Sequence, residues 1–263
     1  MTNTPVLVTG GTGTLGRHVV PLLRAAGRDV RVLSRHGGAA ADGASEAADG
    51  VTYVRCDLLG DATGLADALE GVDTVLHLAG GPKGDDAATR TLVAAARRAG
   101  VRHLVYISVI GADRIPLGYF RAKHVAEEAV ADSGVPYTIL RAAQFHDLAL
   151  TVVEKMAKLP LVPVPGGVRW QPVDAREVAA RLVELALNEP AGLVPDLAGP
   201  EVYAMGELTR GYLRALGRTR PHLPVRVPGK VGRAYRSGAN LTLAGAEQGH
   251  RTWEDFLAER LAS

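Results

Sequence analysis

The chain has 263 residues, of which 47% are hydrophobic and 22% charged, with a formal net charge of +2, values ordinary for a globular protein that buries a sizeable core. Its single cysteine, Cys56, excludes internal disulfides and a zinc site built from cysteines. No apolar run reaches the ~18–20 residues of a membrane span and no signal-like segment opens the chain, so we expect a cytoplasmic protein without a membrane partner.

The first two thirds of the chain alternate short apolar runs with stretches of helical spacing. Strands are predicted at residues 6–9, 30–33, 51–55, 74–78, 103–108 and 137–140. Helices are predicted from residue 15 through Pro21, which we expect to bend that helix, and at 65–69, 87–99 and 119–131. This alternation is typical of an α/β fold with a Rossmann-type, doubly wound parallel sheet.

The rest of the chain is less regular. Residues 36–50 are mostly Gly, Ala, Asp, Ser and Glu, too polar to be buried, and we expect a mobile loop there. After Ala143, prolines and glycines between 160 and 167 break the pattern, and a helix is predicted at 174–187. We therefore expect a core over residues 1–143 and a small C-terminal lobe over 144–263, built on the same core as one structural unit.

A glycine-rich turn follows the first predicted strand, in the stretch Thr9-Gly-Gly-Thr-Gly-Thr-Leu-Gly16. Gly10, Gly13 and Gly16 have the spacing that lets a backbone approach a pyrophosphate at a helix N-terminus. No Lys-Ser or Lys-Thr follows, which excludes a P-loop. The residues expected to contact a dinucleotide here are Gly10, Thr12, Gly13, Thr14, Leu15 and Gly16.

The end of the second predicted strand indicates which dinucleotide binds. NAD enzymes usually place an acid there for the ribose hydroxyls, but this chain has Ser34 and Arg35. A guanidinium and a hydroxyl suit a 2′-phosphate, so we expect NADP(H), although Arg35 could also be a strand-end arginine without that role. Asp57 ends the third strand, where an adenine amino group needs an acceptor.

Several motifs together resemble the short-chain dehydrogenase/reductase superfamily, in particular its atypical, NmrA-like NAD(P)-binding branch. They are Thr9–Gly16, Asp57-Leu58, His77-Leu-Ala-Gly80, Tyr119-Phe-Arg-Ala-Lys123, Gly134–Asp147 and Gln171–Ala179. The resemblance covers roughly residues 5–200. It implies a Rossmann core, a nicotinamide cofactor across the carboxyl ends of the strands, and a substrate pocket shaped by the C-terminal lobe. It adds Leu58, Leu78, Ala79 and Gly80 to the residues expected at the cofactor.

Tyr119 and Lys123 are one turn apart on a predicted helix and form the candidate catalytic pair. A nearby ammonium favours the phenolate, so Tyr119 can exchange a proton with a carbonyl oxygen. In the family this lysine also binds the nicotinamide ribose, and a serine, here Ser108, hydrogen-bonds the substrate carbonyl. Ser108 precedes Tyr119 by 11 positions, fewer than in better-known reductases, so a structural role for its hydroxyl stays open.

Candidate substrate contacts follow the sixth predicted strand. Gln144, Phe145 and His146 lie where substrate or nicotinamide would sit, and Trp170 could line an apolar pocket. Core packing is the alternative for the aromatic residues, and a structural role is the alternative for His146. No spacing of ligand residues suggests a metal.

The function we predict is an NADPH-dependent oxidoreductase that reduces a carbonyl, quinone or enone group of a small, largely apolar molecule. The alternative is a non-catalytic, NADP(H)-sensing regulatory protein of NmrA-like type. Residues 208–246 hold eight Lys or Arg and no acid, which fits a solvated face, an anion site or a nucleic-acid surface. We expect a small-molecule substrate and no nucleic-acid partner. The sequence leaves the oligomeric state open.

Overall fold

The computed structural model describes residues 4–35, 50–60, 64–81 and 84–262, so nearly all of the loop predicted at 36–50 lies outside the described residues. The chain forms two compact units. Unit 1 comprises Met1–Ser108, Ala122–Leu140 and Val178–Val194, and unit 2 comprises Val109–Arg121, Arg141–Glu177 and Pro195–Ser263. The predicted division into residues 1–143 and 144–263 stays a prediction.

Unit 1 is built on a parallel sheet. Its strands are β1 (Val6–Thr9), β2 (Val30–Ser34), β3 (Val51–Arg55), β4 (Thr74–His77), β5 (His103–Val109), β6 (Tyr137–Ala142) and β9 (Gly192–Leu193). They follow the order β6-β5-β4-β1-β2-β3, with β9 beside β6. Thr9 is in register with Leu33 on β2 and with His77 on β4. The strand order therefore reverses at β1, which places the switch point of a Rossmann-type sheet at Thr9 and His77.

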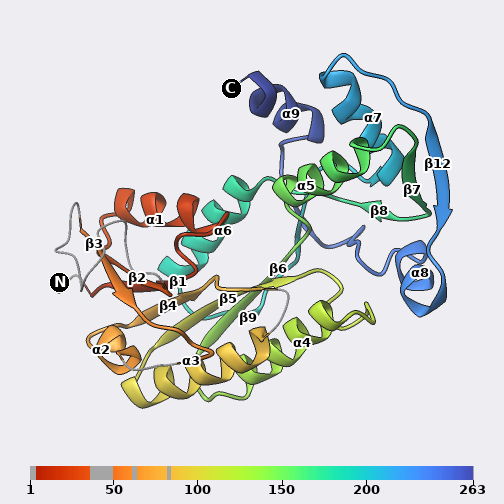
Figure 1. Cartoon of the computed structure of the whole chain (residues 1–263). Coiled ribbons are helices and arrows are strands. Elements are labelled where there is room, and N and C mark those ends of the chain that lie inside the picture. The colour runs from red at the N-terminus through yellow and green to blue at the C-terminus, as the bar shows by residue number, and fades with distance from the viewer. Residues whose placement is uncertain (1–3, 36–49, 61–63, 82–83, 263) are drawn as a thin grey trace. The chain divides into compact units, whose positions relative to one another are not determined.

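Helices cover both faces of this sheet (Figure 1). On one face lie α1 (Gly16–Ala25), which continues through Pro21, and the unit 1 part of α6 (Ala175–Leu187). On the other lie α2 (Leu65–Leu69), α3 (Asp85–Ala99) and the unit 1 part of α4 (Gly118–Ala131). The predicted fold class, an α/β Rossmann-type sheet, is confirmed.

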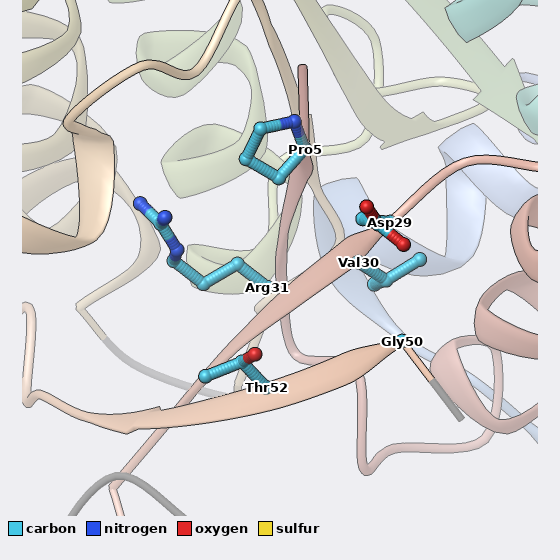
Figure 2. Close-up of a pocket in the computed structure, with 6 residues that line it drawn as sticks. All are labelled: Pro5, Asp29, Val30, Arg31, Gly50 and Thr52. Carbon is cyan, nitrogen blue, oxygen red and sulfur yellow. The ribbon is translucent and has the colours of Figure 1, made fainter. Parts of the chain in front are cut away.

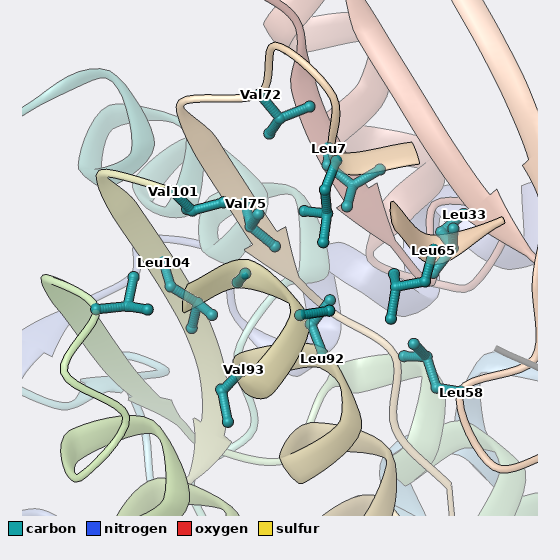
Figure 3. Close-up of a cluster of buried hydrophobic side chains, with 14 of the residues drawn as sticks. Leu7, Leu33, Leu58, Leu65, Val72, Val75, Leu92, Val93, Val101 and Leu104 are labelled. Carbon is teal, nitrogen blue, oxygen red and sulfur yellow. The ribbon is translucent and has the colours of Figure 1, made fainter. Parts of the chain in front are cut away.

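The core of unit 1 lies between the sheet and α2, α3 and α4. Leu7, Val75 and Leu104 project from neighbouring strands toward Leu92 on α3 (Figure 3), and all four are completely buried. Every residue of β5 is buried, as expected for a central strand of a sheet covered on both faces. This rigid sheet fixes where the carboxyl ends of the strands lie.

Unit 2 is mainly helical. Helices α5 (His146–Ala157), α7 (Met205–Ala215) and α9 (Trp253–Ala262) enclose an aromatic and aliphatic cluster that includes Trp253 and Phe256. β8 (Arg169–Trp170) pairs with β11 (Tyr203–Ala204), and β10 (Leu197–Ala198) pairs with Ala142 and with β13 (Glu247–Gln248). The helix α8 is Gly229–Arg236. Within the described ranges, no helix has the length and apolar character to cross a membrane.

One expectation for unit 2 is wrong. The prolines and glycines between 160 and 167 were expected to break the pattern, but Val162–Gly166 forms β7, parallel to β12 (His222–Arg226). Val162 N donates to Pro221 O. In a parallel ladder only every second residue of a strand hydrogen-bonds to a given neighbouring strand. The backbone nitrogens of Pro163 and Pro165 therefore lie at positions that make no hydrogen bond to β12.

Candidate functional site

The glycine turn between β1 and α1 is compact, and most of its glycines serve its own packing. Gly10 has φ +70°, and a Cβ there would lie 2.7 Å from Ala79 N. A Cβ on Gly16 would lie 2.4 Å from Gly10 O, and one on Gly11 would lie 2.7 Å from Val32 Cγ1. Any side chain at these positions would therefore displace the loop after β4, the turn itself or β2.

Gly13 differs from the other glycines of the turn. A Cβ there would meet only Gly10 O, at 3.3 Å, and both Thr12 and Gly13 are exposed. The half-buried Thr14 and the buried Leu15 lead into α1, whose N-terminus has no side-chain cap and no acid in its first turn. A helix N-terminus without a side-chain cap, preceded by a glycine with free space beside it, fits the pyrophosphate of a dinucleotide.

These differences predict opposite effects for two alanine substitutions. Gly16→Ala should lower the melting temperature, because the methyl group collides with backbone atoms 2.4 Å away. Gly13→Ala should leave the melting temperature within a few degrees of wild type but weaken NADPH binding, because the methyl group occupies the open side of the turn. Thermal unfolding and NADPH titration of both variants check this. A Gly13→Ala protein with wild-type NADPH affinity would contradict the proposed phosphate position.

The residues predicted for the adenosine end lie at the ends of β2 and β3. Ser34 O accepts a hydrogen bond from Cys56 N at 3.0 Å, which ties the two strand ends together. Arg35 is exposed directly after β2. Asp57 is half-buried, and its Oδ1 accepts from Leu59 N at 3.1 Å, while the neighbouring Leu58 is buried. The fold thus brings the proposed phosphate ligand and the proposed adenine acceptor to the same edge of the sheet.

A buried hydrogen-bond chain at the switch point was not predicted. Thr9 Oγ1 lies 2.7 Å from His77 Nδ1, and His77 Nε2 lies 3.0 Å from Thr89 Oγ1. Thr89 donates its hydroxyl hydrogen to Asp85 O at 2.7 Å, so it must accept from His77 Nε2, and Thr9 donates to Nδ1. The pKa of His77 falls to about 3, because the ring is buried and because Lys123 is positively charged. His77 is therefore neutral and fixed in one tautomer.

This chain also positions the loop after β4. Ala79 N donates to Thr9 Oγ1 at 3.1 Å, and Gly81 N donates to Asp85 Oδ1 at 2.6 Å. The loop 78–81 contains the residues expected at the cofactor: Leu78 and Ala79 are half-buried and Gly80 is exposed. Side chains from β1 and α3 therefore hold its backbone at the carboxyl end of the sheet.

Lys123 lies buried beside this loop. Its Nζ is 3.1 Å from Asp85 Oδ2 and 3.4 Å from Ile107 O, and it lies 5.0 Å from the centre of the Tyr106 ring. The next residue of β5, Ser108, is also buried, and its Oγ has no hydrogen-bond partner among the described residues. Lys123 and Ser108 are thus brought to the end of the same strand, Lys123 through a bond to the carbonyl of residue 107.

Tyr119 lies in the first turn of α4, one helical turn before Lys123. Its side chain is 40% exposed, and its ring meets the ring of Phe120 edge-on at 5.4 Å. Helix α4 passes from unit 2 to unit 1 after Arg121, so Tyr119 belongs to unit 2 and Lys123 to unit 1. The roles of Ser108, Tyr119 and Lys123 stay proposals.

The candidate substrate residues lie in unit 2, in different environments. Gln144 is buried, and its Oε1 has no hydrogen-bond partner in the described part of the chain. Phe145, which forms a bridge to Val173, and Trp170 are half-buried. A substrate contact stays a prediction for these three residues.

His146 is completely buried in unit 2. Its ring stacks on Phe256 at 5.1 Å and is tilted against Trp253 at 5.9 Å. Burial lowers the pKa of His146 to about 4, although Asp174 opposes the shift. Both ring nitrogens of His146 lack a hydrogen-bond partner among the described residues, so the structural alternative and the substrate contact both stay open. No group of three or more ligand residues that could hold a metal is found among the described residues.

A hollow of about 280 Å³ lies at the amino ends of β1, β2 and β3, opposite the carboxyl ends where the predicted cofactor residues lie (Figure 2). It is lined by residues at the starts of strands, including Pro5, Val30 and Gly50. Arg31 also lines it, and Arg31 Nη1 donates to Ala68 O at 2.6 Å. Because dinucleotides bind at the carboxyl ends of such strands, we do not assign this hollow to the cofactor.

Comparisons with known proteins agree with the dinucleotide assignment. Residues 10–189 match a family described as NAD(P)H-binding. A (4-alkanoyl-5-oxo-2,5-dihydrofuran-3-yl)methyl phosphate reductase from Streptomyces griseus is 32% identical over 257 residues, which covers 92% of this chain and 88% of the relative. Quinone oxidoreductase 2 of Escherichia coli is 29% identical over 221 residues, which covers 81% of this chain and 75% of that protein.

Solved structures show the same fold. An NADPH-dependent quinone oxidoreductase from Escherichia coli, crystallised with NADPH, matches with a TM-score of 0.81 and 20% identity. The match covers 97% of this chain and 99% of the other.

Proposed function

We propose a substrate class for this chain. The chain belongs to the atypical, NmrA-like branch of the NAD(P)H-binding short-chain dehydrogenase/reductases. It is an NAD(P)H-dependent oxidoreductase, and its cofactor is NADP(H). The substrate is a small, largely apolar molecule in which a carbonyl is conjugated to a carbon–carbon double bond, as in a quinone or an enone. Two relatives support the conjugated carbonyl: one name states a quinone, the other an unsaturated 5-oxo-2,5-dihydrofuran that also carries a phosphate.

The observation that carries the proposal is the buried polar end of β5. Ser108 Oγ is buried without a hydrogen-bond partner among the described residues, and the preceding carbonyl, Ile107 O, accepts from Lys123. An unpaired buried hydroxyl costs about 1–3 kcal/mol, so a fold tolerates it best where a ligand completes the bond. A substrate carbonyl oxygen is such a ligand.

Ser108, Tyr119 and Lys123 each have a separate role in the proposed reduction. Reduction of a conjugated carbonyl adds one hydride, which bound NADPH supplies, and one proton. Ser108 donates a hydrogen bond to the oxygen on which negative charge develops. Tyr119 delivers the proton, and Lys123 holds the nicotinamide ribose and keeps a positive charge at the end of β5.

The test of the substrate class is NADPH oxidation with a matched panel. It comprises a quinone, an unsaturated lactone, the saturated form of the same lactone, and a simple ketone. We expect turnover of the two conjugated acceptors and none of the saturated lactone. Preference for the simple ketone would overturn the substrate class, and NADPH binding without any turnover is what the regulatory alternative predicts.

The cofactor preference gives a separate prediction at Arg35. If its guanidinium binds the 2′-phosphate, Arg35→Ala should weaken NADPH binding about 10- to 150-fold, the equivalent of the ~1.5–3 kcal/mol of a charge-assisted bond. NADH affinity should change little. Arg55→Ala is the matched control, since Arg55 is also exposed at a strand end and pairs in register with Ser34. Equal losses for NADPH and NADH, or a larger NADPH loss in Arg55→Ala, would contradict the assignment.

A further inference from the structure

Asp85 is the partner of a lysine that the sequence assigned to the reaction. In unit 1, the side chains of Lys123 and Asp85 are each 5% exposed, and their charged atoms are 3.1 Å apart. The ammonium also contacts the carbonyl of Ile107 and the face of the Tyr106 ring. Neither carries a full negative charge, so within these contacts the neutralisation of Lys123 depends on Asp85.

The carboxylate of Asp85 is held from several sides. Its Oδ1 accepts from Gly81 N at 2.6 Å, and its main-chain oxygen accepts from Thr89, which also accepts from His77. Asp85 opens α3, so it lies at the positive end of that helix dipole. This position favours an anion and disfavours an unpaired cation, so the helix end adds to the need for the carboxylate beside Lys123.

The ion pair lies directly under the loop expected at the cofactor. A Cβ on Gly80 would be 3.0 Å from Lys123 Nζ and 3.3 Å from Asp85 Oδ2. Gly80 is exposed, whereas the pair beneath it is not. The pair is therefore adjacent to the loop residue beside which the nicotinamide ribose is proposed to bind.

Asp85 on α3, His77 on β4 and Tyr106 on β5 act on the Lys123 ammonium in unit 1, and the buried Glu127 lies one turn later on α4. His77 is neutral and cannot neutralise a cation. Because burial penalises an ammonium that has no anion beside it, removal of Asp85 would leave the charge of Lys123 without its closest counter-ion.

We propose that Asp85 is a positioning residue, whose carboxylate neutralises the buried Lys123 ammonium and holds it beside the cofactor loop. The inference rests on the role proposed for Lys123. It assigns to Asp85 a function through Lys123 and no contact with substrate.

The test compares Asp85→Asn with Asp86→Asn. Both substitutions remove one charge from the first turn of α3, but Asp86 pairs with the exposed Arg90 and not with Lys123. Asparagine at position 85 still offers an oxygen to Gly81 N. The chain has five lysines, so the ¹³Cε signals of the side chains can be assigned and titrated by NMR without any cofactor. Turnover and NADPH affinity are measured over the same pH range.

In Asp85→Asn we expect the Lys123 signal to titrate between pH 6 and 9, and turnover to fall about tenfold across that range relative to wild type. In wild type and Asp86→Asn the Lys123 signal should stay constant over this range, and turnover should show only the alkaline limb expected from Tyr119. A Lys123 signal that does not titrate in Asp85→Asn overturns the proposal. So does a signal that titrates while turnover and affinity follow wild type; if Lys123→Met is then also fully active, the role proposed for Lys123 has failed as well.

Should Asp85→Asn not fold, Gly80→Ala perturbs the same pair from the other side, because its methyl group would enter within 3.0 Å of Nζ. The NMR titration of Lys123 is then the readout, since it does not depend on cofactor binding. Titration of Lys123 in Gly80→Ala supports the proposal, and a signal as flat as that of wild type overturns it.

Discussion

Replacing Tyr119 by phenylalanine should lower turnover of the best substrate by about 10²–10⁴, the usual contribution of a positioned proton donor. The substitution removes one hydroxyl and keeps the ring that meets Phe120. The melting temperature and NADPH affinity should therefore stay close to wild type. Steady-state kinetics on the conjugated acceptor, together with NADPH titration, separate a loss of chemistry from a loss of binding.

The pH profile adds an independent check. Turnover of the wild type should fall at alkaline pH as the Tyr119 phenol loses its proton, and this limb should be missing from the residual activity of Tyr119→Phe. Tyr137→Phe is the matched control, because Tyr137 is at the first residue of β6, at the amino end of the sheet. Near-normal turnover in Tyr119→Phe would mean that the proton comes from another group or from water.

Much of the fold could be predicted because each strand carries its own signal. β1 and β3 coincide with the predicted runs, and the other long strands of unit 1 differ by one or two residues at their carboxyl ends. A compact apolar run needs no knowledge of its neighbours to be recognised. β7 was missed because its two prolines disfavour a strand locally, and only pairing with β12 shows that they occupy permitted positions.

The cofactor half of the site could be predicted for a related reason. The glycine turn, Arg35 and Asp57 each stand directly after a predicted strand, so position along the sequence gives their position in space. The sequence overstated one point, since Gly10 and Gly16 are required by contacts with the loop after β4 and within the turn, and of the three only Gly13 has space for a ligand. Spacing alone does not distinguish a glycine that leaves space for a ligand from one that is needed because another part of the chain packs against it.

The interactions around Lys123 were not predictable in this way. Thr9 and His77 are 68 positions apart, and neither Asp85 nor Thr89 belongs to a motif. Asp85 fell outside the predicted helix, which was expected to begin two residues later. The one available signal was that Thr9 and His77 end the two strands that flank the switch point, which are neighbours in a Rossmann-type sheet.

The substrate side lacks such local signals. His146 follows β6, where a ligand contact is expected, yet its ring packs against Trp253 and Phe256 from the far end of the chain. The environment of a lone histidine depends on such distant partners. For this reason the fold and the cofactor follow from the sequence, whereas the substrate class needs the panel of acceptors.

Replacing Lys123 by methionine should give a large loss of stability. Methionine has a similar length, but it leaves the Asp85 carboxylate 5% exposed and without its cation. Removing one partner of a buried ion pair costs about 3–5 kcal/mol. For a chain of this size that corresponds to a fall in melting temperature of about 6–20 °C. Thermal unfolding followed by circular dichroism measures it.

The double variant Lys123→Met/Asp85→Asn shows whether the loss of stability comes from the buried Asp85 carboxylate that no longer has a cation beside it. Two neutral side chains leave no unpaired charge, so the double variant should be more stable than Lys123→Met although it carries one more substitution. The deficit of Lys123→Met should also be smaller at pH 5 than at pH 8, because a buried carboxylate without a cation avoids its desolvation cost by taking up a proton. Lys123→Met/Asp86→Asn is the control and should not recover. Equal stability of Lys123→Met and both double variants at each pH would show that Asp85 and Lys123 are not coupled, and the positioning role of Asp85 would fail with it.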